Sequence, residues 1–353
     1  MEIVYQVGNF SINDIVIKIA GNEHSWSRSV LSYLSMPPAD PVVTGQNELS
    51  LDLYLVSGNE IDQVLPLPGN EYFCLEKTLL VDRPVINRSY QKDKQRWVNY
   101  EGFGRFMLDY GKNRGVAAFI ANSGISQIYA DIVLGYNPLL GLLAGHGYSA
   151  VHASCAQVGG KGVIFTGDSG SGKSTSAYAM LRSGYPVLAD DRILLKKDET
   201  GETGRDEISP GSYSAYSISD VMKLKQEAID KFFPEAKDIN YLHQVEDEYY
   251  FKATAYGGGT YLNSTKIDYL MVFEKTGRLE SRLERVNPSR VVGDLFPVTM
   301  SNYEAPAMEK KFSFLTNFLE SVKCYKVYFG TDMDQFGKSV EELVRVIGGK
   351  ADG

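Results

Sequence analysis

The sequence predicts a mixed α/β protein in which a β-rich region, residues 1–125, precedes a second region of strands and helices, residues 126–353. Short stretches of alternating apolar and polar residues, separated by Gly, Pro, Asn and Asp, fill the first region and are typical of strands. In the second region a glycine-rich segment lies between a predicted strand and a predicted helix. The 353 residues are 43% hydrophobic and 23% charged, which is the composition of a globular protein with one large domain or two ordinary ones.

The first region contains no phosphate-binding loop, paired acids or metal-ligand spacing. Its alternating pattern predicts strands over 5–10, 14–21, 49–58 and 71–81, with further strands within 94–111. A helix is predicted over 128–143. Asn137 and Pro138 interrupt its apolar residues, so we interpret it as a buried helix with a break and not as a membrane span.

The second region has a more regular order of elements. Residues 149–167 predict two strands joined by a turn at Gly159 and Gly160, and a helix over 173–184 and a strand over 185–197 follow. A right-handed crossover would return this last strand beside the one that enters the glycine-rich loop. Further predictions are a polar turn at 198–206, a flexible connection or flap at 255–264, a strand over 267–275, and two helices flanking a strand at 324–330.

Residues 167–174, GDSGSGKS, match the phosphate-loop pattern GxxxxGK[ST] in full. Glycines allow successive backbone N–H groups to face phosphates, and the helix that follows adds the positive end of its dipole. The Lys173 ammonium would contact the β- and γ-phosphates, and the Ser174 hydroxyl would bind Mg²⁺. The loop therefore predicts ATP and Mg²⁺ as cofactors, and the predicted binding residues are Gly167, Asp168, Ser169, Gly170, Ser171, Gly172, Lys173, Ser174 and Thr175.

Two adjacent acids, Asp190 and Asp191, follow the loop after only one helix and one strand. One carboxylate could hold Mg²⁺ while the other accepts the proton of an attacking hydroxyl, as phosphoryl transfer requires. His152 precedes the hairpin that leads into the loop, and there it could orient Asp190 and tune its pKa. The alternatives are two solvated acids at a strand end and a histidine that is simply part of the core.

The histidine, the Gly-Gly turn, GDSGxGKS and ADDR occur in one order and spacing over residues 152–192. This combination resembles the catalytic core of HPr kinase/phosphorylase and its HPr-kinase-like relatives. The resemblance implies a phosphoenolpyruvate-carboxykinase-type nucleotide-binding core, in which residues 167–174 hold ATP and Mg²⁺. It also implies that Asp190 is the catalytic base, that Asp191 lies near the metal with Ser174, and that His152 assists Asp190.

The chain also departs from the bifunctional members of that group. Thr175 stands where they have an acid, and their second signature, associated with phosphorolysis, is not found. Residues 1–125 also differ from their regulatory domain, and we interpret them as a substrate-recognition region. These differences favour a serine kinase without phosphorylase activity, whose acceptor is a peptide or small protein. In size and layout the chain resembles the members that phosphorylate lasso-peptide precursors.

Other functions remain open at this stage. The same residues would suit a kinase of a small-molecule hydroxyl, or a nucleotide-dependent switch or ATPase that transfers no phosphate to an acceptor. Lys252 would be either a second phosphate contact or an ordinary surface lysine, and we expect Arg192 to pair with the acids.

The amino-acid composition excludes several other classes of protein. A net charge of −8 and an isoelectric point near 5.2 argue against a nucleic-acid-binding surface. Three cysteines without a CxxC pair and four scattered histidines argue against a disulfide scaffold and a zinc site. The N-terminus has no signal-peptide pattern, so we expect a cytoplasmic protein without a membrane partner, and the sequence is compatible with a homo-oligomer.

Overall fold

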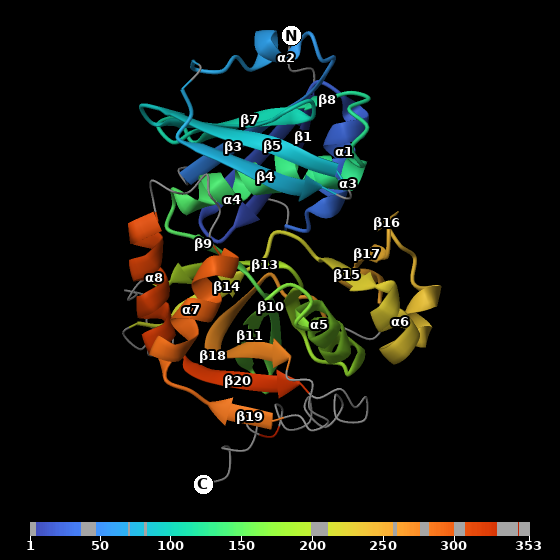
Figure 1. The fold of residues 1–353 in the computed structure, drawn as a ribbon, viewed down its shortest axis with the longest axis vertical. Coiled ribbons are helices and arrows are strands. Elements are labelled where there is room, and N and C mark those ends of the chain that lie inside the picture. Colours follow the sequence, from blue (N-terminus) through green and yellow to red (C-terminus); the bar gives the residue numbers. More distant parts are fainter. Residues whose placement is uncertain are drawn as a thin grey trace. The chain divides into compact units, whose positions relative to one another are not determined.

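The computed structural model describes residues 5–36, 47–69, 71–80, 83–198, 211–256, 260–275, 282–299, 308–329 and 345. Two compact units are present, and the chain passes from the first to the second between Gly147 and Tyr148 (Figure 1). The predicted change of region was at residues 125 and 126. The structure therefore adds the helical segment after residue 126 to the β-rich unit.

An eight-stranded sheet forms most of the first unit, as the alternating pattern predicts. Its strands are β1 (Tyr5–Ile12), β2 (Ile15–Gly21), β3 (Asn47–Val56), β4 (Cys74–Leu80), β5 (Arg83–Lys92), β6 (Gln95–Tyr100), β7 (Gly104–Asp109) and β8 (Arg114–Ile120). Their order is β1-β2-β3-β8-β7-β6-β5-β4, in which β3 runs parallel to both its neighbours and the other pairs are antiparallel. The unit also contains the helices α1 (His24–Tyr33) and α2 (Ile61–Val64).

The predicted helix over 128–143 is present, but its irregular part is a π-helical segment that ends just before the predicted break at Asn137 and Pro138. It comprises α3 (Gln127–Ala130), the π-helical η1 (Asp131–Tyr136) and α4 (Asn137–Ala144). Pro138 is the second residue of α4 and directly follows η1, and its ring nitrogen has no N–H to donate to the preceding turn. In the described part of the chain, no helix is long and apolar enough to cross a membrane.

The second unit is built on a nine-stranded sheet. Its strands are β9 (Ser149–His152), β10 (Ser154–Val158), β11 (Lys161–Gly167), β12 (Val187–Ala189), β13 (Arg192–Lys197), β14 (Tyr213–Tyr216), β18 (Ser264–Lys275), β19 (Arg282–Arg285) and β20 (Lys323–Phe329). Seven of them follow the order β12-β10-β11-β18-β14-β13-β9, while β20 pairs with β18 and β19. Parallel and antiparallel pairs occur together, which confirms the predicted mixed α/β class.

Helices cover both faces of this sheet (Figure 1). Val163 and Phe165 of β11 pack with α5 (Lys173–Arg182), whereas Ile164 between them packs in the core that contains α7 (Pro288–Thr299) and α8 (Met308–Ser321). This alternation follows from the two-residue period of a strand. Since both faces of β11 are buried, the centre of the strand is apolar throughout. Packing on both faces fixes the strand that leads into the loop.

One topological prediction is wrong. The strand after α5 does not lie beside β11, because β10 pairs with β11 on one side and with β12 on the other. The predicted strand over 185–197 is also divided, since β12 ends at Ala189 and β13 starts at Arg192 in another part of the sheet. The Gly159–Gly160 turn between β10 and β11 is confirmed, with Val158 opposite Lys161.

A three-stranded sheet completes the second unit in the order β15-β17-β16. Its elements are β15 (Val221–Lys225), β16 (His243–Val245) and β17 (Glu248–Lys252), with α6 (Gln226–Phe232) and the short 3-10 helices η2 (Pro234–Asp238) and η3 (Ala253–Ala255). Residues 199–206 of the predicted polar turn, the centre of the predicted flap at 257–259 and, apart from residue 345, the predicted helix after residue 330 lie outside the described residues.

Candidate active site

The glycine-rich loop connects β11 to α5 in the order that a phosphate loop requires. Gly167, Gly170 and Gly172 have φ angles of 142°, 72° and 107°, a region that side-chain-bearing residues rarely adopt. A Cβ atom on Gly167 would also lie 2.6 Å from the Phe273 carbonyl oxygen of β18. The glycines are therefore required by the backbone conformation and, at Gly167, by the neighbouring strand.

Lys173 is the first residue of α5 and is buried. Its ammonium donates hydrogen bonds to the carbonyl oxygens of Gly167 at 2.8 Å and Asp168 at 3.0 Å, which holds it across the loop. Burial lowers the pKa of Lys173, and Asp191 and Asp190 oppose this shift. A nucleotide phosphate would replace the two carbonyl groups as the acceptor for this cation.

The other predicted loop residues differ in how exposed they are to solvent and hence to a ligand. Asp168, Ser169 and Gly170 are exposed at the tip of the loop, and Ser171 is buried beneath it. Ser174 and Thr175 are half-buried in the first turn of α5.

The sheet brings the acid pair to the end of the phosphate loop. Both β11 and β12 run antiparallel to β10, which lies between them, so their carboxyl ends reach the same edge. Asp190 immediately follows β12, and the structure gives it a side-chain hydrogen bond to Ser174. The predicted proximity of the acids to the loop is thus reached by a different strand order from the one expected.

Asp190 is almost completely buried, with 2% of its surface exposed. One carboxylate oxygen accepts the backbone N–H of Lys223 at 2.8 Å, and the other lies 3.4 Å from the Ser154 hydroxyl. The Ser154 hydroxyl also donates to the Asp190 carbonyl oxygen. Burial raises the pKa of Asp190 to about 6, although the hydrogen bonds from Lys223 and Ser174 oppose the shift. A carboxylate of this kind can exchange a proton near neutral pH.

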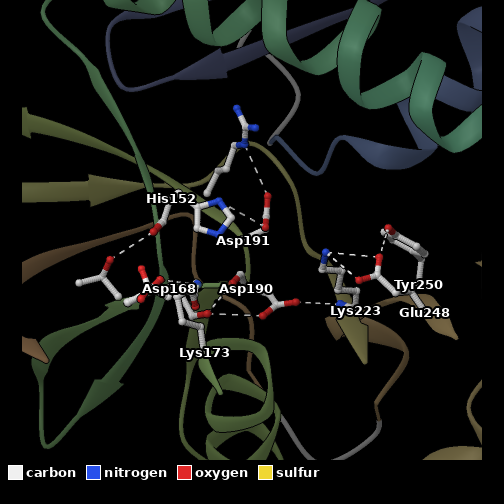
Figure 2. Close-up of polar contacts among 12 residues, drawn as sticks. His152, Asp168, Lys173, Asp190, Asp191, Lys223, Glu248 and Tyr250 are labelled. Carbon is white, nitrogen blue, oxygen red and sulfur yellow. Dashed lines mark hydrogen bonds and ion pairs between the residues drawn. The ribbon is translucent and has the colours of Figure 1, made fainter. Parts of the chain in front are cut away.

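Asp191 is half-buried and lies beside the His152 imidazole (Figure 2). Its carboxylate lies 3.8 Å from Nδ1 of His152 and 3.5 Å from Nε of Arg192. Burial acts to raise its pKa, but His152, Lys223, Arg192 and Lys173 together lower the pKa to about 2. Asp191 is therefore ionised at neutral pH, and the pairing expected for Arg192 is present.

His152 ends β9 opposite Arg192 of β13, so strand pairing brings it to the acids. Asp191 acts to raise its pKa, but burial and the charges of Lys173, Arg192 and Lys223 lower the pKa below its ordinary value. At pH 7 the imidazole is consequently neutral. The structure places it against Asp191, whereas the sequence suggested a role beside Asp190.

The three-stranded sheet supplies residues that sequence reasoning missed. Lys223 lies on β15, and Glu248 and Tyr250 lie on β17. In Figure 2 Lys223 lies next to Asp190, and Glu248 and Tyr250 lie on the far side of Lys223. Nζ of Lys223 is 3.3 Å from a Glu248 carboxylate oxygen, and the Tyr250 hydroxyl donates to Glu248 at 2.8 Å. Short apolar and aromatic runs with flanking charges, VMKLK and EYYFK, were the available signal, and they indicate strands but no site.

Lys252, considered as a second phosphate contact, instead pairs with a buried acid. Its ammonium lies 3.4 Å from Asp220, whose carboxylate also accepts the Thr254 hydroxyl at 2.7 Å.

The residues present fit a magnesium ion bound together with a nucleotide. Magnesium in such sites needs one or two protein oxygens, because phosphates and water supply the rest. The Ser174 hydroxyl can supply one such oxygen, and the ionised Asp191, which follows the Asp190 carboxylate bonded to Ser174, can supply another. Within the described ranges, no three or more His, Cys, Asp and Glu side chains form a metal-binding group.

Sequence comparison supports the resemblance to HPr-kinase-like proteins that the motifs indicate. Over 177 residues, 49% of this chain, it is 28% identical to HPr kinase/phosphorylase from Streptococcus salivarius, 56% of whose length is covered. Over 94 residues it is 33% identical to HPr kinase/phosphorylase from Streptococcus thermophilus, covering 26% of this chain and 29% of that protein. The matched parts thus span little more than half the length of the first relative and less than a third of the second. Over the matched part, the resemblance to HPr-kinase-like proteins is confirmed.

Two further comparisons complete this picture. A solved structure of the HPr(Ser) kinase/phosphatase from Coxiella burnetii is 14% identical and covers 58% of this chain and 99% of that one, with a TM-score of 0.30. No protein-family model matches the sequence.

Proposed function

We propose that this chain is an ATP- and Mg²⁺-dependent kinase that transfers the γ-phosphoryl group to a serine hydroxyl of a peptide or small protein. The observation that carries the proposal is the position of Asp190. A buried carboxylate with a pKa of about 6 is hydrogen-bonded to Ser174, directly beside the lysine of the phosphate loop. A protein that only binds nucleotide has no need of such a group there.

The proposed step is a direct displacement at the γ-phosphorus. The acceptor oxygen forms the new P–O bond, the bond between the γ-phosphorus and the β–γ bridging oxygen breaks, and ADP leaves with that oxygen. Asp190 takes the hydroxyl proton, so the step is balanced without another reactant. Because Asp190 accepts N–H and O–H groups from Lys223 and Ser174, its carboxylate is fixed before the acceptor binds.

The remaining residues of the site neutralise the phosphate charge and keep the reacting groups in position. Lys173 neutralises the transferring phosphoryl group, and Ser174 and Asp191 would hold the magnesium ion, whose charge offsets that of the phosphates. The Arg192 guanidinium pairs with Asp191, and the neutral imidazole of His152 beside it leaves Asp190 as the group that titrates near neutral pH.

The decisive experiment separates binding from transfer. Purified protein is incubated with γ-labelled ATP and Mg²⁺ together with HPr, a lasso-peptide precursor with a C-terminal serine, or a small alcohol, and the products are identified by mass. We expect phosphoserine on one of the polypeptides. Slow release of phosphate with every acceptor would instead identify a switch or ATPase, and a labelled small alcohol would identify a metabolite kinase.

Asp190→Asn is the matched variant for this assay. Its amide oxygen can still accept the Lys223 N–H, so nucleotide affinity should stay within about twofold while transfer falls by about 100- to 10,000-fold. Full transfer by this variant would contradict the assignment of the base.

We also propose that residues 1–125 recognise the acceptor, because the phosphate loop and both acids lie in the second unit. An acceptor peptide that carries a photoreactive group should then form cross-links before residue 126. Cross-links confined to later residues would reject this assignment.

A further inference from the structure

Lys223 is the residue whose position the proposed transfer step leaves unexplained. Its backbone N–H orients the base, but its side chain extends to a separate pair of residues, Glu248 and Tyr250. The lysine is one-third exposed, so a bound group can reach it. Figure 2 shows Asp190 between Lys173 and Lys223.

Strand pairing explains why Lys223 is held in this position. Lys223 lies opposite Tyr250 and diagonally from Glu248 across the β15–β17 pair. Residues two apart on a strand share a face, so Glu248 and Tyr250 lie on the side of the sheet from which Lys223 projects. The Tyr250 hydroxyl fixes the carboxylate at 2.8 Å, and the carboxylate holds the ammonium at 3.3 Å. The cation is therefore anchored before any ligand binds.

The charge of Lys223 also reaches the rest of the site. It lowers the pKa of Asp190, Asp191 and His152. Burial acts to lower the pKa of Lys223 itself, but Asp191, Glu248 and Asp190 outweigh burial and leave this pKa raised. The lysine consequently stays charged at every pH at which the site would operate.

We infer that Lys223 forms a second cationic subsite, which binds the oxyanion of the phosphoryl group as it moves from ATP to the acceptor. Lys173 serves the nucleotide side of that group and Lys223 the acceptor side, with Glu248 and Tyr250 as positioning residues. This inference rests on the proposed kinase function. Lys223 acts through charge alone and exchanges no proton.

The test uses a mimic of the transferring group, so that it does not depend on knowing the acceptor. The full chain is titrated with MgADP alone and with MgADP plus fluoroaluminate, and the ratio of the two dissociation constants measures oxyanion binding. We expect fluoroaluminate to strengthen MgADP binding to the wild type. In Lys223→Met this gain should fall by about 10- to 150-fold, the range of a charge-assisted hydrogen bond, with MgADP affinity unchanged.

Lys225→Met is the matched control. Lys225 lies on the same face of β15, but its exposed ammonium pairs with Asp247 at 3.6 Å on the surface. This variant should keep the full gain from fluoroaluminate. Lys223→Arg should keep most of it, because the charge and the backbone N–H remain, and this variant guards against a fold defect in Lys223→Met.

Each outcome bears on a different statement. If the wild type binds no MgADP, the proposed kinase function fails. If the wild type binds MgADP but gains nothing from fluoroaluminate, or if Lys223→Met keeps the full gain, the Lys223 subsite is refuted and the kinase function stands.

Discussion

Replacing Asp190 by Asn should stabilise the protein while it abolishes phosphoryl transfer. The folded-state pKa of about 6 exceeds the ordinary value of 3.8 because the carboxyl group is buried. The folded state therefore binds the Asp190 proton more tightly than the unfolded chain. Stability from this group is fully present below pH 3.8 and is lost as the pH rises through 6.

The size of the effect follows from the shift. The shift is about two pKa units, and each unit corresponds to about 1.36 kcal/mol. Ionisation of Asp190 therefore lowers the free energy of unfolding by about 3 kcal/mol at pH 8. At pH 5 the cost is about half of that, because the folded carboxyl is still mostly protonated. The asparagine keeps an oxygen for the Lys223 N–H and carries no charge to desolvate.

Thermal unfolding of wild type and Asp190→Asn at pH 5 and pH 8 measures this difference. For a unit of this size, about 3 kcal/mol corresponds to a higher melting temperature of about 6–12 °C at pH 8, and the advantage should shrink at pH 5. Asp191→Asn is the control with the opposite sign, because the pKa of Asp191 is lowered and its ionised form stabilises the fold at neutral pH. If Asp190→Asn melted below the wild type at pH 8, or at an offset independent of pH, the buried-base argument would be refuted.

Four further outcomes are expected. The wild-type transfer rate, measured with saturating ATP, should rise with pH through an inflection near 6, because Asp190 must be ionised to accept a proton, and a flat profile would exclude it as the base. Lys173→Met should weaken MgATP binding, measured by calorimetry, by about 10- to 150-fold. Gly167→Ala places a Cβ against the Phe273 carbonyl and should lower the free energy of unfolding, measured with denaturant, by about 1–3 kcal/mol. Iodoacetamide should modify the half-buried Cys74 well before the fully buried Cys155, whose thiol pKa is raised further by burial; equal labelling in peptide maps of native protein would contradict the described core.

Local sequence patterns could predict the elements and the phosphate loop, because these depend on neighbouring residues. The Gly159–Gly160 turn, the buried β11 and the loop glycines each have a short-range signal in the chain. No short-range signal in the sequence predicts that β10 lies between β11 and β12. A strand that is buried on both faces can pair with several partners, and the chain's tertiary packing decides among them.

The candidate site divides in the same way. Residues 167–174 and the acid pair belong to one continuous motif, so the sequence could bring them together. Lys223, Glu248 and Tyr250 arrive from a separate sheet later in the chain, and their pattern is that of any half-exposed strand pair. His152 was correctly expected near the acids, but the register of β9 with β13 directs it to Asp191.

The hydrogen bond from the Lys223 backbone to Asp190 joins the small sheet to the large one at the point where chemistry is proposed. If the three-stranded sheet opened locally while the nine-stranded core stayed folded, the carboxylate would lose the N–H that orients it. Amide hydrogen exchange at residue 223 would then report directly on the fraction of molecules that are ready to react. A ligand that slowed this exchange would be favouring the competent state, and one that accelerated it would act as an inhibitor without occupying the phosphate loop.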